Sequence, residues 1–112
     1  MNADGVRRAL ARAGETIRLR RVTQRIPFDV ACQVLVTIGG ATTLVGGVQQ
    51  TADRVLMTAD ELDAARWPGP PRHGDQVIYD DGTIAIVQGR ADTRRMSGGD
   101  RVFTLTAIDG QT

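Results

Sequence analysis

The stretch Arg72–Gly89, RHGDQVIYDDGTIAIVQG, contains the clearest local structural signal in the chain. An apolar run at Val77–Tyr79 is followed by a reversal at Asp80–Gly82 and a second apolar run at Ile84–Val87. Two strand-forming runs on either side of an Asp-Gly reversal predict a β-hairpin. A third run, Arg101–Ile108 (RVFTLTAI), predicts a strand that extends the hairpin into a meander. Three strands form a stable unit when one face is covered, so the earlier segments are expected to supply that cover.

Three further strands are predicted before this hairpin. In Glu15–Val22, Ile17 and Leu19 alternate with arginines, which is the period of a half-buried strand. After a turn at residues 24–27, the run Phe28–Ile38 is apolar at every second position, and its length indicates a strand that bends or serves two sheets. A short strand is predicted at Arg54–Met57.

Two helices are predicted around these strands. Residues Ala3–Ala13 have an apolar stripe at helical spacing, and a helix this short is marginal unless it docks on its own barrel or on a neighbour. Thr58 and Glu61 have the spacing of a capping box, which predicts a helix over Ala59–Arg66 that ends before the proline-rich segment. Trp67, the only tryptophan, is expected to plug one end of the barrel beside that helix.

The predicted fold class is mainly β: a small six-stranded antiparallel barrel with an N-terminal helical arm and one short helix after the third strand. The arm is assigned to residues 1–14 and the barrel domain to residues 15–110. Residues 39–47 (GGATTLVGG) are predicted to be a loop, either an ordinary hairpin connection or a mobile loop that orders against a partner. Residues 91–100 are predicted to be a second exposed loop, and residues 109–112 to fray.

Composition excludes several kinds of chemistry. The formal net charge is only +1, so there is no general excess of positive charge for binding duplex nucleic acid. The chain has no lysine, which excludes a P-loop, and Cys32 is its only cysteine, which excludes an intrachain disulfide and a cysteine cluster for zinc. His73 is the only histidine and is placed in an exposed turn, so no catalytic triad is predicted; we expect no enzymatic activity, no metal and no cofactor.

Targeting signals are likewise not evident in the sequence. The N-terminus lacks the apolar core of a signal peptide, and no stretch has the roughly 18 consecutive apolar residues of a membrane span. We therefore expect synthesis in the cytoplasm and no membrane partner.

Two features are candidate partner-binding sites. The first is the basic face of the N-terminal arm, formed by Arg7, Arg8 and Arg12, which is either a solvated helix face or a docking surface for an acidic protein or DNA phosphates. The second is the predicted loop with an apolar tip, and its candidate residues are Gly39, Gly40, Thr42, Thr43, Leu44, Val45, Gly46 and Gly47.

The order of these elements resembles the head-tail joining proteins of long-tailed bacteriophages, also called head completion or stopper proteins, with relatives in prophages and gene transfer agents. The resemblance rests on a basic start (VRRALARAGETIRLRRV), a middle block running from LVGGVQQ to the central hairpin, and the closing VFTLTAI strand. Within the hairpin it rests on a G-D-x-V … D-G … V pattern, which here is Gly74, Asp75, Val77, Asp81, Gly82 and Val87.

The resemblance implies a structural component of the virion neck that is made in the host cytoplasm. Copies that are monomeric when free would form a ring, hexameric in the family, between the portal-adaptor assembly of the head and the tail terminator. The ring would close the DNA channel, and DNA would pass through it without sequence-specific contact. By position, residues 39–47 would face the channel or a neighbouring subunit, and the arginine face would meet the adaptor. The alternative is a small barrel that binds single-stranded nucleic acid, which would require exposed stacking aromatics.

Overall fold

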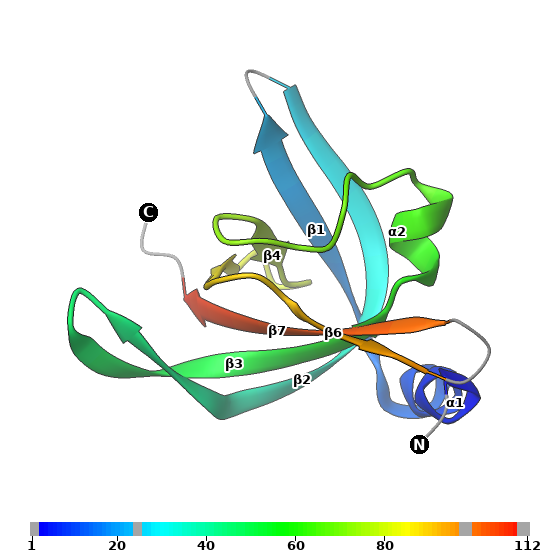
Figure 1. Ribbon diagram of the computed structural model, residues 1–112, viewed down its shortest axis with the longest axis horizontal. Helices are drawn as coiled ribbons and strands as arrows, with labels where there is room; N and C mark the ends of the chain where they lie inside the picture. Colours follow the sequence, from blue (N-terminus) through cyan, green and yellow to red (C-terminus); the bar gives the residue numbers. More distant parts are fainter. Residues whose placement is uncertain (1–2, 24–25, 97–99, 110–112) are drawn as a thin grey trace.

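The computed structural model describes residues 3–23, 26–96 and 100–109. Figure 1 shows one strand-built body with a helix at one end and a projecting hairpin at the other. In chain order the elements are α1 (Ala3–Ala13), β1 (Glu15–Thr23), β2 (Ile26–Val45), β3 (Val48–Thr58), α2 (Asp60–Ala64), β4 (Gln76–Ile78), β5 (Ile84–Val87), β6 (Asp92–Arg95) and β7 (Arg101–Asp109).

Within the described residues, six strands close an antiparallel barrel in the order β3-β2-β1-β4-β5-β7, and β7 pairs back with β3. The remaining strand, β6, lies beside β7 beyond the end of β5: β5 pairs with residues 107–109 of β7, and β6 pairs with residues 101–104. The predicted six-stranded barrel, with its N-terminal helix and a short helix after the third strand, is confirmed, and β6 adds one strand to its edge.

The interior is filled by side chains at alternate strand positions. In β2 the inward residues Val30, Cys32 and Val34 are 7%, 1% and 0% exposed, as the alternation of apolar residues predicts. Burying an aliphatic side chain of this kind contributes roughly 1.5–3 kcal/mol. The other barrel strands contribute Ile17, Leu19, Val55, Met57, Val77, Ala85, Val87, Phe103, Leu105 and Ala107.

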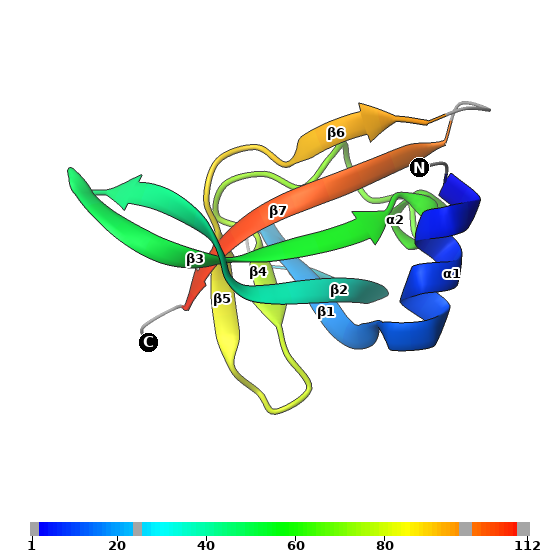
Figure 2. The same ribbon diagram turned by 90° about the horizontal axis from the view of Figure 1, so that it is seen from below.

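The prediction of a loop at residues 39–47 is wrong for most of this range, because β2 continues to Val45. A bulge between Thr37 and Ala41 bends the strand out of the barrel, and residues 41–45 then pair with residues 48–52 of β3. Only Gly46 and Gly47 form the turn, with φ of 58° and 81°, the positive values that a tight two-residue hairpin requires. We call residues 38–52 the hairpin extension; it projects from the barrel at the left of Figures 1 and 2.

Helix α1 docks on its own barrel, which decides between the two docking partners left open by the sequence. Val6 and Leu10 are 1% and 5% exposed and form a second apolar cluster with Val102 of β7. Leu35 and Leu56 of the outer sheet face pack against this cluster. The helix is therefore packed against the folded body.

Helix α2 is shorter than predicted, and the prediction of a capping box at its start is wrong. Its N-cap is Ala59 and carries no side-chain capping bond, because Thr58 still belongs to β3. Glu61 instead accepts a hydrogen bond from the backbone N–H of Gln33 at 2.9 Å, which ties α2 to β2. Arg66, with a φ of 60°, lies in the left-handed region directly after the helix.

Three other boundaries differ from the prediction. The connection predicted at residues 91–100 contains strand β6, and its residues 97–99 lie outside the described part. Of the turn predicted at residues 24–27, the first two residues lie outside the described part, and Ile26 and Pro27 already belong to β2. At the C-terminus, β7 extends to Asp109, and residues 110–112 lie outside the described part.

Candidate partner-binding surfaces

The hairpin extension exposes apolar side chains that the barrel does not cover. Ile38, Leu44 and Val48 are 85%, 71% and 60% exposed. Strand β1 pairs with β2 only as far as Val34, and β7 pairs with β3 only from Asp53 onward, so both edges of the extension lack a neighbouring strand within the described residues. A two-stranded ribbon of this kind can bind another chain through its strand edges or through its exposed apolar side chains.

All the candidate residues between 39 and 47 lie on this extension. Gly39, with a φ of 68°, and Gly40 occupy the bulge, where a Cβ on Gly40 would lie 2.8 Å from the Thr37 side chain. The predicted loop did not include the pairing of residues 41–45 with residues 48–52 of β3. The available signal was Gly-Gly flanked on both sides by β-branched residues, which is typical of a two-residue hairpin.

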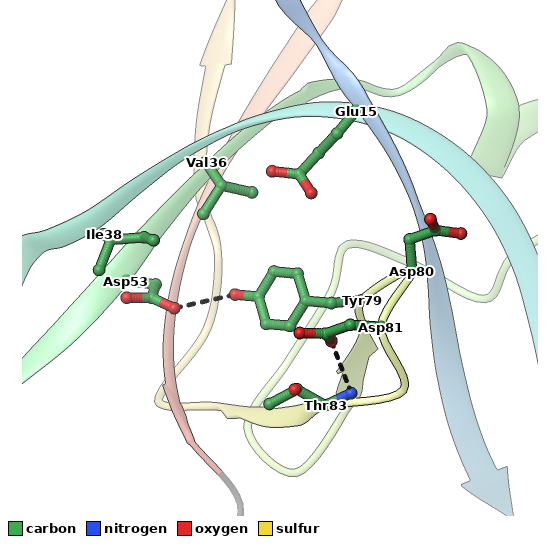
Figure 3. A pocket seen from close by; sticks show the side chains of 8 residues that line it. All are labelled: Glu15, Val36, Ile38, Asp53, Tyr79, Asp80, Asp81 and Thr83. Atoms are coloured by element: carbon green, nitrogen blue, oxygen red, sulfur yellow. Dashed lines mark hydrogen bonds between the residues drawn. The ribbon is translucent and has the colours of Figure 1, made fainter.

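At the base of the extension lies the mouth of the barrel, which is acidic (Figure 3). A cavity of about 400 Å³ is lined there by Glu15, Val36, Ile38, Asp53, Tyr79, Asp80, Asp81 and Thr83. The Tyr79 hydroxyl donates to Asp53 at 3.0 Å, and its ring packs against the core. Among the described residues, no group of three His, Cys, Asp or Glu side chains could hold a metal ion.

Trp67, which the sequence predicts to plug one end of the barrel, is buried in the main core cluster. The residue is 6% exposed. The centroid of its ring lies 5.6 Å from that of Phe28, and the Arg21 guanidinium carbon lies 4.8 Å from the Trp67 centroid. Arg21 also forms a bidentate ion pair with Asp75, with both contacts at 2.8 Å. Its remaining donors bind the carbonyl oxygens of Pro68 and Pro70, so this one side chain holds the proline-rich segment against the barrel.

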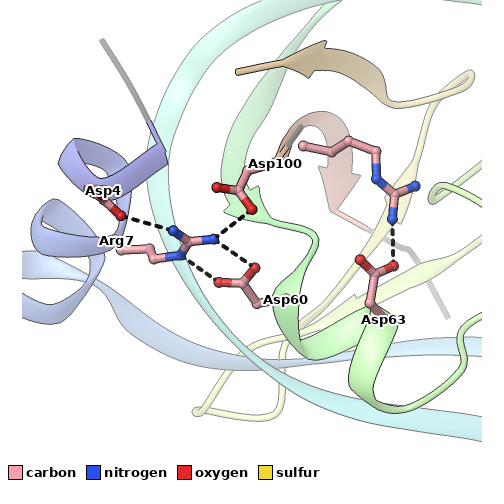
Figure 4. A network of polar contacts seen from close by, with 6 residues as sticks. Asp4, Arg7, Asp60, Asp63 and Asp100 are labelled. Carbon is pink, nitrogen blue, oxygen red and sulfur yellow. Dashed lines mark hydrogen bonds and ion pairs between the residues drawn. The ribbon is translucent and has the colours of Figure 1, made fainter. Parts of the chain in front are cut away.

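The three arginines of α1 do not share one role. Arg7 donates to Asp60 at 2.8 Å and forms ion pairs with Asp100 at 3.1 Å and Asp4 at 3.0 Å (Figure 4). The hydrogen bond to Asp60 raises the pKa of Arg7 and lowers the pKa of the Asp60 carboxyl. Arg8 and Arg12 are exposed and have no ion pair with another described residue. Arg7 therefore fastens α1 to its own barrel, and Arg8 and Arg12 remain available to a partner.

The two side chains most often used in nucleophilic and acid–base catalysis are a buried cysteine and an exposed histidine. Cys32 is 1% exposed, and burial raises the pKa of its thiol to about 12, with the Glu61 charge adding to the effect. His73 is exposed, and its Nδ1 accepts a hydrogen bond from the backbone N–H of Gly89 at 3.1 Å. A protonated, buried thiol has neither the ionisation nor the access of a reactive cysteine.

Comparison of the chain with protein-family models and with curated proteins finds no match. Neither helix of the described chain is long and apolar enough to cross a membrane.

Proposed function

We propose that this protein is a structural component that joins the head and tail of a long-tailed phage or gene transfer agent. In this role, copies form a ring between the portal-adaptor assembly and the tail terminator and close the DNA channel. The resemblance of the sequence to joining proteins suggests the role, and the small closed barrel with its projecting hairpin extension is compatible with it.

The observation that carries the proposal is the hairpin extension. It exposes three large apolar side chains and two strand edges, while the barrel behind it has a complete core of its own. Because the barrel does not need the extension for its closure, the extension is free to bind other proteins. In the proposed ring it faces the channel or the neighbouring subunit.

The arginine face is divided between two tasks in this proposal. Arg8 and Arg12, which are exposed, face the adaptor on the head side, and Arg7 holds the helix in position for them. A ring of identical contacts needs only a modest interface in each copy, because every subunit is held by two neighbours. The free protein is then monomeric, and DNA passes through the ring without sequence-specific contact.

The alternative, a module that binds single-stranded nucleic acid, requires aromatic rings on an open sheet face. The chain has four aromatic residues. Trp67 and Phe103 are buried, and Tyr79 is partly buried with its hydroxyl bonded to Asp53. Phe28 is 39% exposed, but it is a single ring and packs on Trp67. No observation in the described residues favours this alternative, so joining is the function we propose.

Gene deletion in the bacterium that produces the particle tests the proposal. We expect electron microscopy of the lysate to show separate heads and separate tails, with joining restored by the wild-type gene on a plasmid. Normal joined particles from the deletion strain would contradict the proposal. Sequence-independent binding of single-stranded oligonucleotides by the purified protein at low salt would favour the alternative.

A further inference from the structure

The molecule carries an acidic projection at the barrel mouth. Asp80 and Asp81, in the turn between β4 and β5, are both exposed. The turn is held by Gly82, which has a φ of 90°, and by Asp81, whose Oδ1 accepts a hydrogen bond from Thr83 N at 2.9 Å. Glu15, on the same mouth, adds to the negative charge (Figure 3).

A groove of opposite character lies on the outer face of β3, β7 and β6, beside α1. It has a volume of about 660 Å³ and an apolar floor, and it is bordered by Arg54 and Arg94. Neither guanidinium has a hydrogen bond or ion pair with another residue in the described ranges. The groove is lined by Val6, Arg54, Leu56, Asp92, Thr93, Arg94, Met96, Val102 and Thr104.

The charge of this groove is only partly balanced by its own residues. Asp92 is the single acid in the lining, against two arginines, and Arg90 and Arg95 are exposed close by in the chain. An exposed arginine beside apolar surface is well suited to pairing with a carboxylate when a partner covers both. The ligand that this lining fits is therefore a short acidic turn.

One molecule cannot bring its own turn to its own groove. In Figure 2 the β4–β5 turn points downward, and β6 lies on the opposite side of the molecule. Figure 1 agrees with this, since it shows β6 in front and β4 behind. Complementary surfaces on opposite sides produce a head-to-tail contact between two copies, which can be repeated until a ring closes.

We propose that the Asp80–Gly82 turn of one copy docks in the Arg54–Arg94 groove of the next copy. This inference rests on the proposed function, which requires copies to associate, and it names the contact that joins them. Asp80 and Asp81 pair with Arg54 and Arg94, which have no ion pair with another residue in the described ranges. Other acidic proteins of the particle are the competing occupants of the groove.

Disulfide trapping of purified protein tests the contact without reference to the particle. A chain carrying D81C and R94C, oxidised at high concentration and low salt, is expected to give covalent dimers, trimers and longer multimers. Cys32 need not be removed because it is buried. The matched control carries D81C and R12C, since Arg12 is also exposed but lies on α1. Absence of multimers, or equal multimers in the control, would overturn the inference.

Charge reversal in the particle gives the second arm of the test. D80R/D81R and R54D/R94D are each expected to abolish joining, and the chain with all four substitutions is expected to restore it, because the contact is rebuilt with reversed signs. Normal joining by either reversed pair overturns the docking contact but leaves the proposed function standing. If R94C becomes linked only to a different virion protein, that protein is the occupant and the inference is wrong. If deleting the gene does not affect joining, the proposed function fails, whatever the trapping result.

Discussion

Arg21 and Asp75 form an ion pair whose side chains are only 5% and 3% exposed. A charge buried this deeply is tolerated because the partner and additional hydrogen bonds replace its hydration, and Arg21 makes such bonds to two proline carbonyls. Removing one partner leaves the other buried and unpaired. The pair therefore specifies the position of the proline-rich segment more than it adds net stability.

Arg21→Met is expected to lower the free energy of unfolding by about 3–5 kcal/mol, because the Asp75 carboxylate would be left in the interior without its counter-charge. Urea unfolding followed by the fluorescence of Trp67, which lies under this guanidinium, measures the loss. Arg18→Met is the matched control, since the Arg18 side chain is 61% exposed. Equal unfolding midpoints for the two variants would show that the buried pair is dispensable.

The ion pair of Asp29 with Arg20 is expected to make the stability of the fold depend on pH. Arg20 donates to both of its carboxylate oxygens, at 2.6 and 2.8 Å, and this lowers the pKa of Asp29. A carboxyl with a lowered pKa in the folded state contributes stability above its ordinary pKa of about 4, and that stability is lost as the pH falls through the folded value. We expect the melting temperature to decrease when the pH is lowered below about 4. In the Arg20→Gln variant we expect this decrease to be smaller. An unchanged slope in Arg20→Gln would mean that other carboxyls determine it.

At the scale of elements, the sequence predicts best where one face of a strand is buried. The hairpin at residues 72–89 and the core positions of β2 follow directly from alternation and from the Asp-Gly turn. Strand β6 could not be found in this way because all four of its side chains are exposed, so it carries no alternation. In the hairpin extension most side chains are likewise exposed, so the Gly46-Gly47 turn is its only clear signal in the sequence.

Contacts between residues far apart in the chain account for the rest of what the sequence did not predict. Arg7 looked like part of a free basic face, but it lies beside Asp60 and Asp100, which follow it by more than fifty residues. Glu61 was assigned to a local cap but bonds the backbone of β2. Such partners are determined by the closure of the barrel, which local spacing does not encode.

The docking of α1 can be tested with two neighbouring arginines. Arg7→Gln is expected to increase hydrogen exchange of the α1 amides severalfold, because the helix loses its ion pairs to Asp60 and Asp100 and is held only by Val6 and Leu10. Arg8→Gln, on the exposed side of the same helix, should leave exchange unchanged. Exchange that is equally fast in both variants would indicate that the apolar contact alone holds the helix.

At the scale of the whole molecule, folding and the proposed assembly function are assigned to different parts of the chain. The barrel closes through pairing between β3 and β7, while the hairpin extension pairs only within itself in the described structure. A protein divided in this way should tolerate loss of the extension in its fold but not in its function. Deleting Thr42–Val45 together with Val48–Thr51 creates the appropriate variant, because Gly46-Gly47 would then connect Ala41 to Ala52, which are already paired.

The shortened protein is expected to keep its circular dichroism spectrum and to change in unfolding free energy by no more than about 0.5 kcal/mol, since the deleted segment contains mostly exposed side chains. In the complementation experiment it should leave heads and tails separate. Gln50→Ser, which keeps the extension intact, serves as the control and should support joining. If the shortened protein does not fold, the extension is part of the core. If it supports joining, the extension is not part of the interface. Folded protein with unjoined particles is the one result that locates assembly in the extension.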